Sequence, residues 1–166
     1  MAKPFLDETG SGMHLHVSVY DQKGKNIFAS PNRYGNSKLK NAIAGLQSNF
    51  YDSFPIFIPN QNGYRRIQTR KFVPVNTSWS WNRRDASLRI PAGSKNAKRV
   101  EHRAASADAN PYLVLSCVLI GIHNGLTNKL KPTNKIDFDN TEGADKHADP
   151  EMPRNLSLIH ISEPTR

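Results

Sequence analysis

Apolar and polar residues alternate along segment 13–20, whose sequence is Met-His-Leu-His-Val-Ser-Val-Tyr. Such strict alternation is typical of a β-strand with one buried face and one polar face. The polar face carries His14, His16 and Ser18, which are all side chains that can bind a ligand. The pattern therefore predicts a half-buried strand whose second face is rich in ligand-type atoms.

Two other segments have helical spacing. Within 37–52, apolar residues recur three or four positions apart, at Leu39, Ala42, Ile43, Leu46 and Phe50. This spacing predicts an amphipathic helix that ends near Asp52. A second apolar stripe follows Asn110 and Pro111, a pair typical of a helix N-cap and first turn. It predicts a helix that continues to about Leu130.

Extended, β-rich sequence occupies 74–81, 86–90 and 100–103. The first two segments are joined by the short polar sequence Asn-Arg-Arg-Asp, which predicts a β-hairpin. In the third segment, alternation places Glu101 and Arg103 on one face. The chain is thus expected to combine short strands with two amphipathic helices.

The composition is that of one ordinary folded domain. The 166 residues are 37% hydrophobic and 22% charged, which argues against general disorder. The longest apolar run, within 112–122, is too short to cross a bilayer, and residues 1–8 contain no apolar signal region. The single cysteine, Cys117, cannot form an internal disulfide, which suits a reducing compartment. We expect a cytoplasmic protein.

The formal net charge of +9 indicates an anionic partner. A basic balance is common in nucleic-acid-binding domains, which makes such a domain one candidate. Eight arginines fall in one central stretch, at Arg65, Arg66, Arg70, Arg83, Arg84, Arg89, Arg99 and Arg103. Because they are interspersed with strand-like sequence, they also suit a pocket for small polyanions, whose oxygens a guanidinium binds in pairs.

Three clusters carry candidate chemistry, and each has two interpretations. His14 and His16 follow a glycine-rich turn, and they are either ligands or ordinary surface histidines. Arg84 and Arg89 flank the expected hairpin turn, and they either bind an anion or lie in a solvated loop. Glu101 lies among arginines, and it is either an ion-pair partner or an oxygen ligand for Mg²⁺ or Mn²⁺.

Five motifs, taken in order, resemble successive motifs of the class I glutamine synthetase family. They are Gly-Ser-Gly-Met-His-Leu-His at 10–16, Asn-Gly-Tyr-Arg-Arg at 62–66, Asn-Arg-Arg-Asp-Ala-Ser-Leu-Arg-Ile-Pro at 82–91, Arg-Val-Glu-His-Arg at 99–103 and Ala-Asn-Pro-Tyr-Leu at 109–113. The resemblance extends from about Thr9 to Pro132. Parts of these sequence motifs are most similar to those of the γ-glutamylpolyamine synthetase branch. Since the family explains the arginines, it disfavours nucleic acid as the partner.

The resemblance implies a nucleotide site on the first strand. His14 and Glu101 would bind the Mg²⁺ or Mn²⁺ that holds the phosphates of ATP. His16 and Ser18, together with Arg89, would line the nucleotide pocket. The lysine that the family uses there falls at a gap near residues 95–96 and is not assigned.

The resemblance also implies the reaction. Arg84 and Arg89 would be catalytic, stabilising the γ-phosphoryl group as it moves to the glutamate side chain, and an amine would then attack to form the γ-glutamyl amide. The Gly10 backbone, Arg66 and Arg103 would bind glutamate. Three departures accompany these matches. Thr9 replaces an asparagine that helps to bind glutamate. In a second departure, the family's other metal-binding carboxylates lie outside this sequence, which therefore also permits a catalytically inactive regulatory relative.

The third departure concerns the amine. Phe72 stands where ammonium-using enzymes of the family have a proton-accepting glutamate. A phenyl ring cannot accept a proton, but it can pack against the carbon chain of a larger amine. We therefore expect an alkylamine or polyamine substrate, with a glutamine synthetase that uses ammonium as the alternative.

The family further implies an α+β fold, forming part of a curved, largely antiparallel sheet with helices packed outside it. Residues 1–133 would be the C-terminal half of the catalytic domain, followed by a truncated polar segment at 134–155. Residues 156–166 are similar to a translated sequencing adapter, so we expect a non-native tail there. The full-length protein would form a homo-oligomeric ring, and this fragment alone is expected to be inactive.

Overall fold

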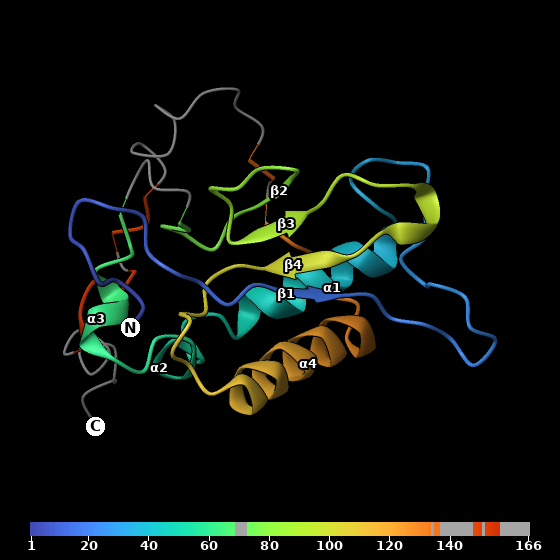
Figure 1. Cartoon of the computed structure of the whole chain (residues 1–166). Helices are drawn as coiled ribbons and strands as arrows, with labels where there is room; N and C mark the ends of the chain where they lie inside the picture. The colour runs from blue at the N-terminus through green and yellow to red at the C-terminus, as the bar shows by residue number, and fades with distance from the viewer. Residues whose placement is uncertain (69–72, 134, 137–147, 151, 157–166) are drawn as a thin grey trace.

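The computed structural model describes residues 1–68, 73–133, 135–136, 148–150 and 152–156. Within these residues, a four-stranded sheet lies against two long helices (Figure 1). The strands are β1 (Leu15–Val17), β2 (Trp79–Trp81), β3 (Leu88–Ile90) and β4 (Val100–His102), in the spatial order β1-β4-β3-β2. The helices are α1 (Ser37–Ser48), α2 (Phe54–Phe57), α3 (Gln61–Tyr64) and α4 (Pro111–Thr127), with a 3₁₀ turn at Lys95–Ala97. The α+β prediction is confirmed.

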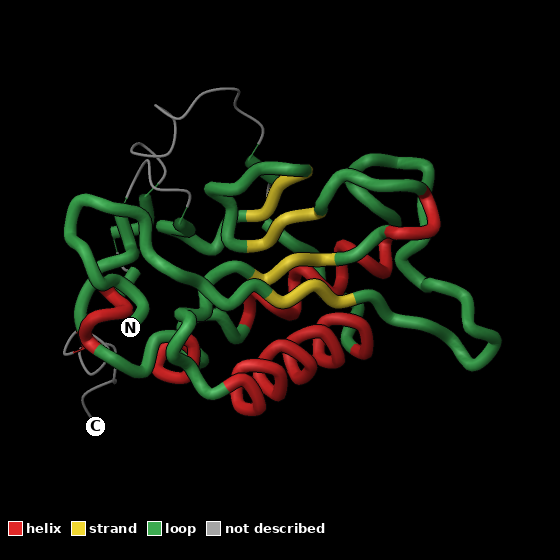
Figure 2. Tube along the Cα trace, viewed as in Figure 1, coloured by secondary structure: helices red, strands yellow, loops and turns green. Residues whose placement is uncertain are grey.

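The centre of the sheet is antiparallel. Strand β4 pairs antiparallel with β1 on one side, where Leu15 lies opposite His102, and with β3 on the other side, where Arg89 lies opposite Glu101. The alternation predicted for 13–20 is retained, since His14 and His16 are exposed while the apolar residues between them are half-buried. The strand itself is shorter than predicted. Figure 2 shows that long loops make up much of the described chain.

The predicted β-hairpin is wrong, because β2 and β3 pair in parallel. Trp79 lies opposite Leu88, and Trp81 lies opposite Ile90. Instead of reversing the chain into an antiparallel partner, residues 82–87 lead it back beside the start of β2 before β3 begins. We call residues 82–87 the return loop. Asn82 starts it with a positive φ of 54°, a conformation that asparagine tolerates better than most residues.

Both long helices begin where the sequence predicts. The side chain of Asn36 accepts a hydrogen bond from the main chain of α1, and the side chain of Asn110 accepts from the N–H groups of Tyr112 and Leu113 in α4. The helices end three or four residues earlier than expected. No helix in the described part of the chain is long and apolar enough to span a membrane.

The helices α1 and α4 contact each other through glycines. A Cβ on Gly45 would lie 2.0 Å from the carbonyl oxygen of Gly121, and one on Gly125 would lie 2.1 Å from that of Asn41. The two backbones therefore approach more closely than any larger residue permits. This close pair forms the layer that supports the face of the sheet opposite the polar strand face (Figure 1).

Histidine His102 belongs to this apolar layer. It alternates with Glu101 along β4, so it lies on the other face of the sheet, where its ring centroid is 4.5 Å from that of Phe57 and 5.7 Å from that of Phe50. Burial lowers its pKa to about 3, and it is therefore neutral at physiological pH. His102 is a core residue and does not face the polar side of the sheet.

Candidate active site

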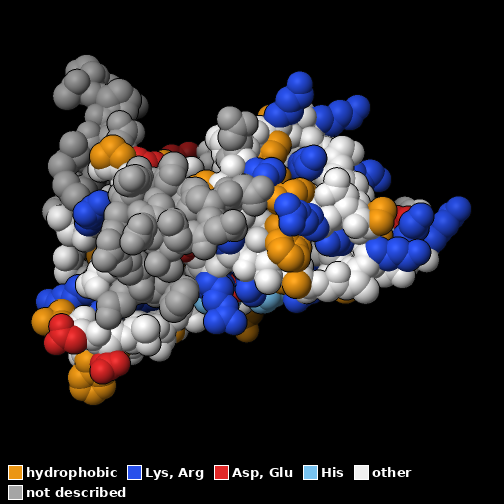
Figure 3. Space-filling view, turned by 90° about the horizontal axis from the view of Figure 1, so that it is seen from above, with side chains coloured by type: hydrophobic (Ala, Val, Ile, Leu, Met, Phe, Trp, Pro, Cys, Tyr) orange, Lys and Arg blue, Asp and Glu red, His pale blue; other side chains and the backbone are white. Residues whose placement is uncertain are grey.

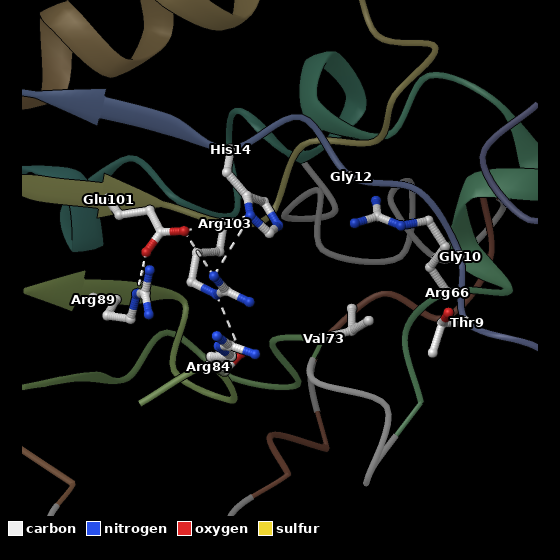
Figure 4. Close-up of a pocket in the computed structure, with 10 residues that line it drawn as sticks. All are labelled: Thr9, Gly10, Gly12, His14, Arg66, Val73, Arg84, Arg89, Glu101 and Arg103. Carbon is white, nitrogen blue, oxygen red and sulfur yellow. Dashed lines mark hydrogen bonds and ion pairs between the residues drawn. The ribbon is translucent and has the colours of Figure 1, made fainter. Parts of the chain in front are cut away.

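A cavity of about 390 Å³ opens on the polar face of the sheet (Figure 4). It is lined by Thr9, Gly10, Gly12, His14, Arg66, Val73, Arg84, Arg89, Glu101 and Arg103. Most of the site residues predicted from the sequence are in this set, although they come from five separate segments. The lining residues include four guanidinium groups and a single carboxylate, so the cavity is suited to anionic ligands.

The carboxylate of Glu101 is the centre of the charged end of the cavity. Arg89 Nε donates to Oε2, and Arg103 Nη1 donates to Oε1 at 2.7 Å. His14 Nδ1 and His16 Nε2 lie 3.3 Å and 3.6 Å from Oε1. Burial alone would raise the pKa of Glu101, but hydrogen bonds from His14 and Arg89 and the charge of Arg103 hold it at about 2. The group is therefore ionised at neutral pH.

Two of these groups have the chemistry of a metal site. His14 supplies an imidazole, Glu101 supplies an ionised carboxylate, and their nearest donor atoms are 3.3 Å apart. Neighbouring ligands in an octahedral Mg²⁺ shell with bonds of about 2.1 Å are separated by about 3 Å, so the pair fits one cation. In the described part of the chain, no group of three or more His, Cys, Asp or Glu residues is arranged to hold a metal. The remaining ligands of such an ion must come from elsewhere.

Of the three residues predicted for the nucleotide, Arg89 lines the cavity, whereas His16 and Ser18 do not. Ser18 Oγ donates to the Lys98 carbonyl at 3.3 Å, and His16 Nδ1 accepts from Arg99 Nε at 3.1 Å. The second contact places the His16 proton on Nε2, toward Glu101. Burial lowers the pKa of His16, and the charge of Arg99 adds to this effect while Glu101 opposes it. Sequence reasoning missed Arg99 as the partner of His16.

Arginine Arg66 forms the opposite end of the cavity and is only 3% exposed (Figure 4). Its Nη1 donates to the Ala104 carbonyl at 3.5 Å, whereas its buried Nε has no hydrogen-bond partner in the described structure. Burial lowers its pKa to about 10 despite the charge of Asp108, so it remains cationic. A Cβ on Gly10 or on Gly12 would come within 2.5 Å of its side chain. These glycines thus make room for the arginine side chain.

The return loop brings Arg84 to the wall of the cavity at the charged end, beside Arg103 (Figure 4). The main-chain carbonyl of Arg84 accepts from Arg103 Nε at 3.1 Å, which ties the loop to β4. Burial lowers the pKa of Arg103, and Glu101 opposes this shift. Val73 lines the cavity between Arg84 and the end formed by Arg66. Phe72, predicted to contact the amine, lies outside the described residues.

Comparisons with known proteins show which family the chain resembles. A family profile for the glutamine synthetase catalytic domain matches residues 1–158. The chain is 39% identical over 142 residues to γ-glutamylputrescine synthetase PuuA of Escherichia coli, and 38% identical over 143 residues to a glutamine synthetase of Sulfolobus acidocaldarius. It is 36% identical over 138 residues to a glutamate–isopropylamine ligase of a Pseudomonas species.

These matches cover most of this chain but only part of each relative. They include 86%, 82% and 82% of the chain, but 30% of the length of each of the three relatives. A solved structure described as apo GmaS without ligand superposes with a TM-score of 0.79 at 26% identity, covering 96% of this chain and 36% of the other. Since the family profile covers nearly its whole length, the chain belongs to the glutamine synthetase catalytic-domain family.

Proposed function

We propose that this chain carries part of the active site of an ATP- and Mg²⁺-dependent ligase that joins glutamate to an amine through γ-glutamyl phosphate. The observation that carries the proposal is the convergence of Arg66, Arg84, Arg89 and Arg103 with Glu101 on one cavity. A triphosphate and a dicarboxylate are the ligands that such a set of guanidinium groups binds best. Two of the relatives described above are named as ligases or synthetases that use an amine.

The charged end of the cavity suits the nucleotide. Arg84 and Arg89 stabilise the negative charge of the γ-phosphoryl group while the glutamate γ-carboxylate attacks phosphorus and ADP leaves. His16 and Ser18 lie beside this end and contact the rest of the nucleotide. His14 and Glu101 hold Mg²⁺ or Mn²⁺, which when bound neutralises phosphate charge.

The opposite end suits glutamate. Arg66 has a buried guanidinium with an unused donor, and this is the state expected of a group that awaits an anionic partner. Arg66, Arg103 and the Gly10 main chain bind the glutamate carboxylates. The amine nitrogen then attacks the acyl carbon of γ-glutamyl phosphate, inorganic phosphate leaves, and the nitrogen loses its proton to a base or to water.

The identity of the nucleophile rests on one position. Phe72 offers an apolar ring where ammonium-using relatives have a carboxylate, so we propose an alkylamine or a polyamine as the acceptor. A glutamine synthetase that uses ammonium is the second candidate, because relatives with that name match the chain almost as well. The proposal also includes a cytoplasmic homo-oligomeric ring and excludes nucleic acid and membrane as partners.

The proposal is tested by ADP release from the full-length protein that contains this chain. ATP, Mg²⁺ and glutamate are held at saturation while putrescine, ethylamine and ammonium are compared, and mass spectrometry identifies the amide. We expect amide formation, with the highest kcat/KM for one of the two organic amines. If ammonium gives the highest value, the protein is a glutamine synthetase, and if no nitrogen compound supports ADP release, the ligase assignment is wrong.

A further inference from the structure

The return loop holds the cavity residue Arg84 between two residues that do not line the cavity. Arg83 Nε donates to Asp85 Oδ1 at 3.0 Å, and Arg83 Nη2 donates to Asp85 Oδ2 at 2.6 Å. Two parallel hydrogen bonds of this kind define the relative orientation of both side chains. The pair therefore closes a small ring around Arg84, across residues i and i+2.

Other contacts constrain the same loop through its main chain. The Arg84 carbonyl accepts from Arg103 Nε at 3.1 Å, and the Ser87 carbonyl accepts from the Arg103 main-chain N–H at 3.0 Å. At the start of the return loop, the N–H of Asn82 donates to the Ile90 carbonyl over 2.9 Å. The Arg84 side chain is exposed and extends into the cavity from this constrained backbone (Figure 4).

We propose that the Arg83–Asp85 ion pair is a positioning clamp that fixes Arg84 for phosphoryl transfer. The inference rests on the ligase function proposed above and adds two residues that do not line the cavity. An arginine that stabilises transition-state charge must be held in place before the reaction, and a displacement of about 1 Å in an active site can lower the rate about a hundredfold. The two side chains are 19% and 21% exposed, so loss of the pair can also lower stability, and the melting temperature is therefore measured beside the kinetics.

The clamp can be tested without removing any group from the cavity wall. Asp85→Asn keeps the shape of the side chain but removes its charge, and the double variant Arg83→Asp with Asp85→Arg restores the pair in reverse. Asp21→Asn is the matched control, because Asp21 accepts hydrogen bonds from the Lys23 and Lys25 main chains in an exposed turn outside the cavity.

Three readouts are measured on the full-length protein: kcat and KM for ATP and glutamate, the melting temperature, and positional isotope exchange of the β,γ-bridging oxygen of ATP in the presence of glutamate. Isotope exchange reports phosphoryl transfer without amide formation. For Asp85→Asn we expect kcat and the exchange rate to fall together by about ten- to a hundredfold, with an unchanged glutamate KM. The reversed pair should recover at least half of this loss on a logarithmic scale, and Asp21→Asn should show none.

Hydrogen exchange of the peptide that covers 82–88 tests the clamp independently of turnover. We expect faster exchange in Asp85→Asn than in the unmodified protein, and no change there in Asp21→Asn. An unmodified protein without ligase activity refutes the proposed function, while this exchange measurement still decides whether the pair constrains the loop. An active protein whose kcat is insensitive to Asp85→Asn, or whose loss of kcat is not rescued by the reversed pair, overturns the clamp.

Discussion

The substitution Gly10→Ala tests whether the glycine-rich turn exists to accommodate Arg66. The added Cβ would lie 2.5 Å from Arg66 Cγ and 2.8 Å from the Ala2 carbonyl oxygen. Carbon atoms in contact are about 3.5–4.0 Å apart, so the overlap with Arg66 is at least about 1 Å. Because one of the two obstacles is main chain and Arg66 is buried, the strain cannot be relieved by a simple rotamer change.

The expected consequence is a displaced guanidinium at the glutamate end of the cavity. A shift of about 1 Å predicts a kcat/KM for glutamate that is lower by about a hundredfold, mostly through KM. The ATP KM should change little, because Arg84, Arg89 and Glu101 lie at the other end. Overpacking should also cost about 1–3 kcal/mol of stability.

Steady-state kinetics of the full-length protein at saturating ATP provide the assay. Gly93→Ala is the control, since its Cβ would find its nearest neighbours at 3.8 Å, which is ordinary contact. A glutamate KM in Gly10→Ala that equals the unmodified value would show that Arg66 does not bind glutamate or that the turn yields without moving it. A rise in the KM for ATP instead of the KM for glutamate would mean that the Arg66 end of the cavity binds the nucleotide and the Glu101 end binds glutamate.

The remaining predictions concern charge, the nucleotide and packing. The pKa of Glu101 is lowered from its ordinary value of 4.5 to about 2. The stability that its charge provides should therefore be complete above pH 4.5 and lost as the pH falls toward 2. A urea midpoint that is constant between about pH 5 and 2 would contradict this. Arg99→Ala removes the hydrogen bond to His16, and a charged hydrogen bond is worth about 1.5 kcal/mol. The KM for ATP should therefore rise by roughly tenfold. An unchanged KM for ATP would speak against the contact. Gly45→Ala places a Cβ 2.0 Å from the Gly121 carbonyl oxygen, so the free energy of unfolding in urea should fall by about 1–3 kcal/mol. An unchanged urea midpoint would mean that the two helices are not in backbone contact.

The surface of the molecule shows why charge alone was an ambiguous guide to function. In Figure 3, basic side chains appear at several separate places on the visible face and are not confined to one patch. The arginines of the cavity are different, because Arg66 and Arg103 are buried. Buried cations need specific partners, whereas exposed ones do not. Burial, which the sequence does not report directly, separates these two arginines, but not the exposed Arg84, from the general basic surface.

Local signals in the sequence predicted the local structure well. Asn110 caps α4 as predicted, because its side-chain oxygen satisfies main-chain donors that have no other partner there. The start of α1 followed from the apolar spacing, and the structure adds Asn36 as its N-cap. The alternation around His14 and His16 placed both on the polar face. The pairing of β2 with β3 was predicted less well, since a short polar connection favours an antiparallel hairpin. Asn82 alone does not indicate that the chain returns to pair in parallel.

The site itself was predicted as a set of residues but not as a network. The motifs identified Glu101 and its arginines, whereas the sequence could not show that Arg89 and Arg103 both bind this carboxylate. The ion-pair and metal-ligand interpretations of Glu101 are therefore not exclusive, because one carboxylate oxygen also lies 3.3 Å from His14. The role of Phe72 stays a prediction, because that residue lies outside the described part of the chain.

The central proposal is an acyl phosphate formed from glutamate and ATP, and oxygen-18 transfer tests it most directly. The full-length protein is supplied with glutamate labelled in its γ-carboxylate, with unlabelled ATP and with the preferred amine, and the inorganic phosphate is analysed by mass spectrometry. Attack of the γ-carboxylate on phosphorus, followed by attack of the amine on the acyl carbon, leaves one carboxylate oxygen on the phosphate. We therefore predict one labelled oxygen in each phosphate released. Unlabelled phosphate released together with γ-glutamyl amide would contradict the γ-glutamyl phosphate mechanism.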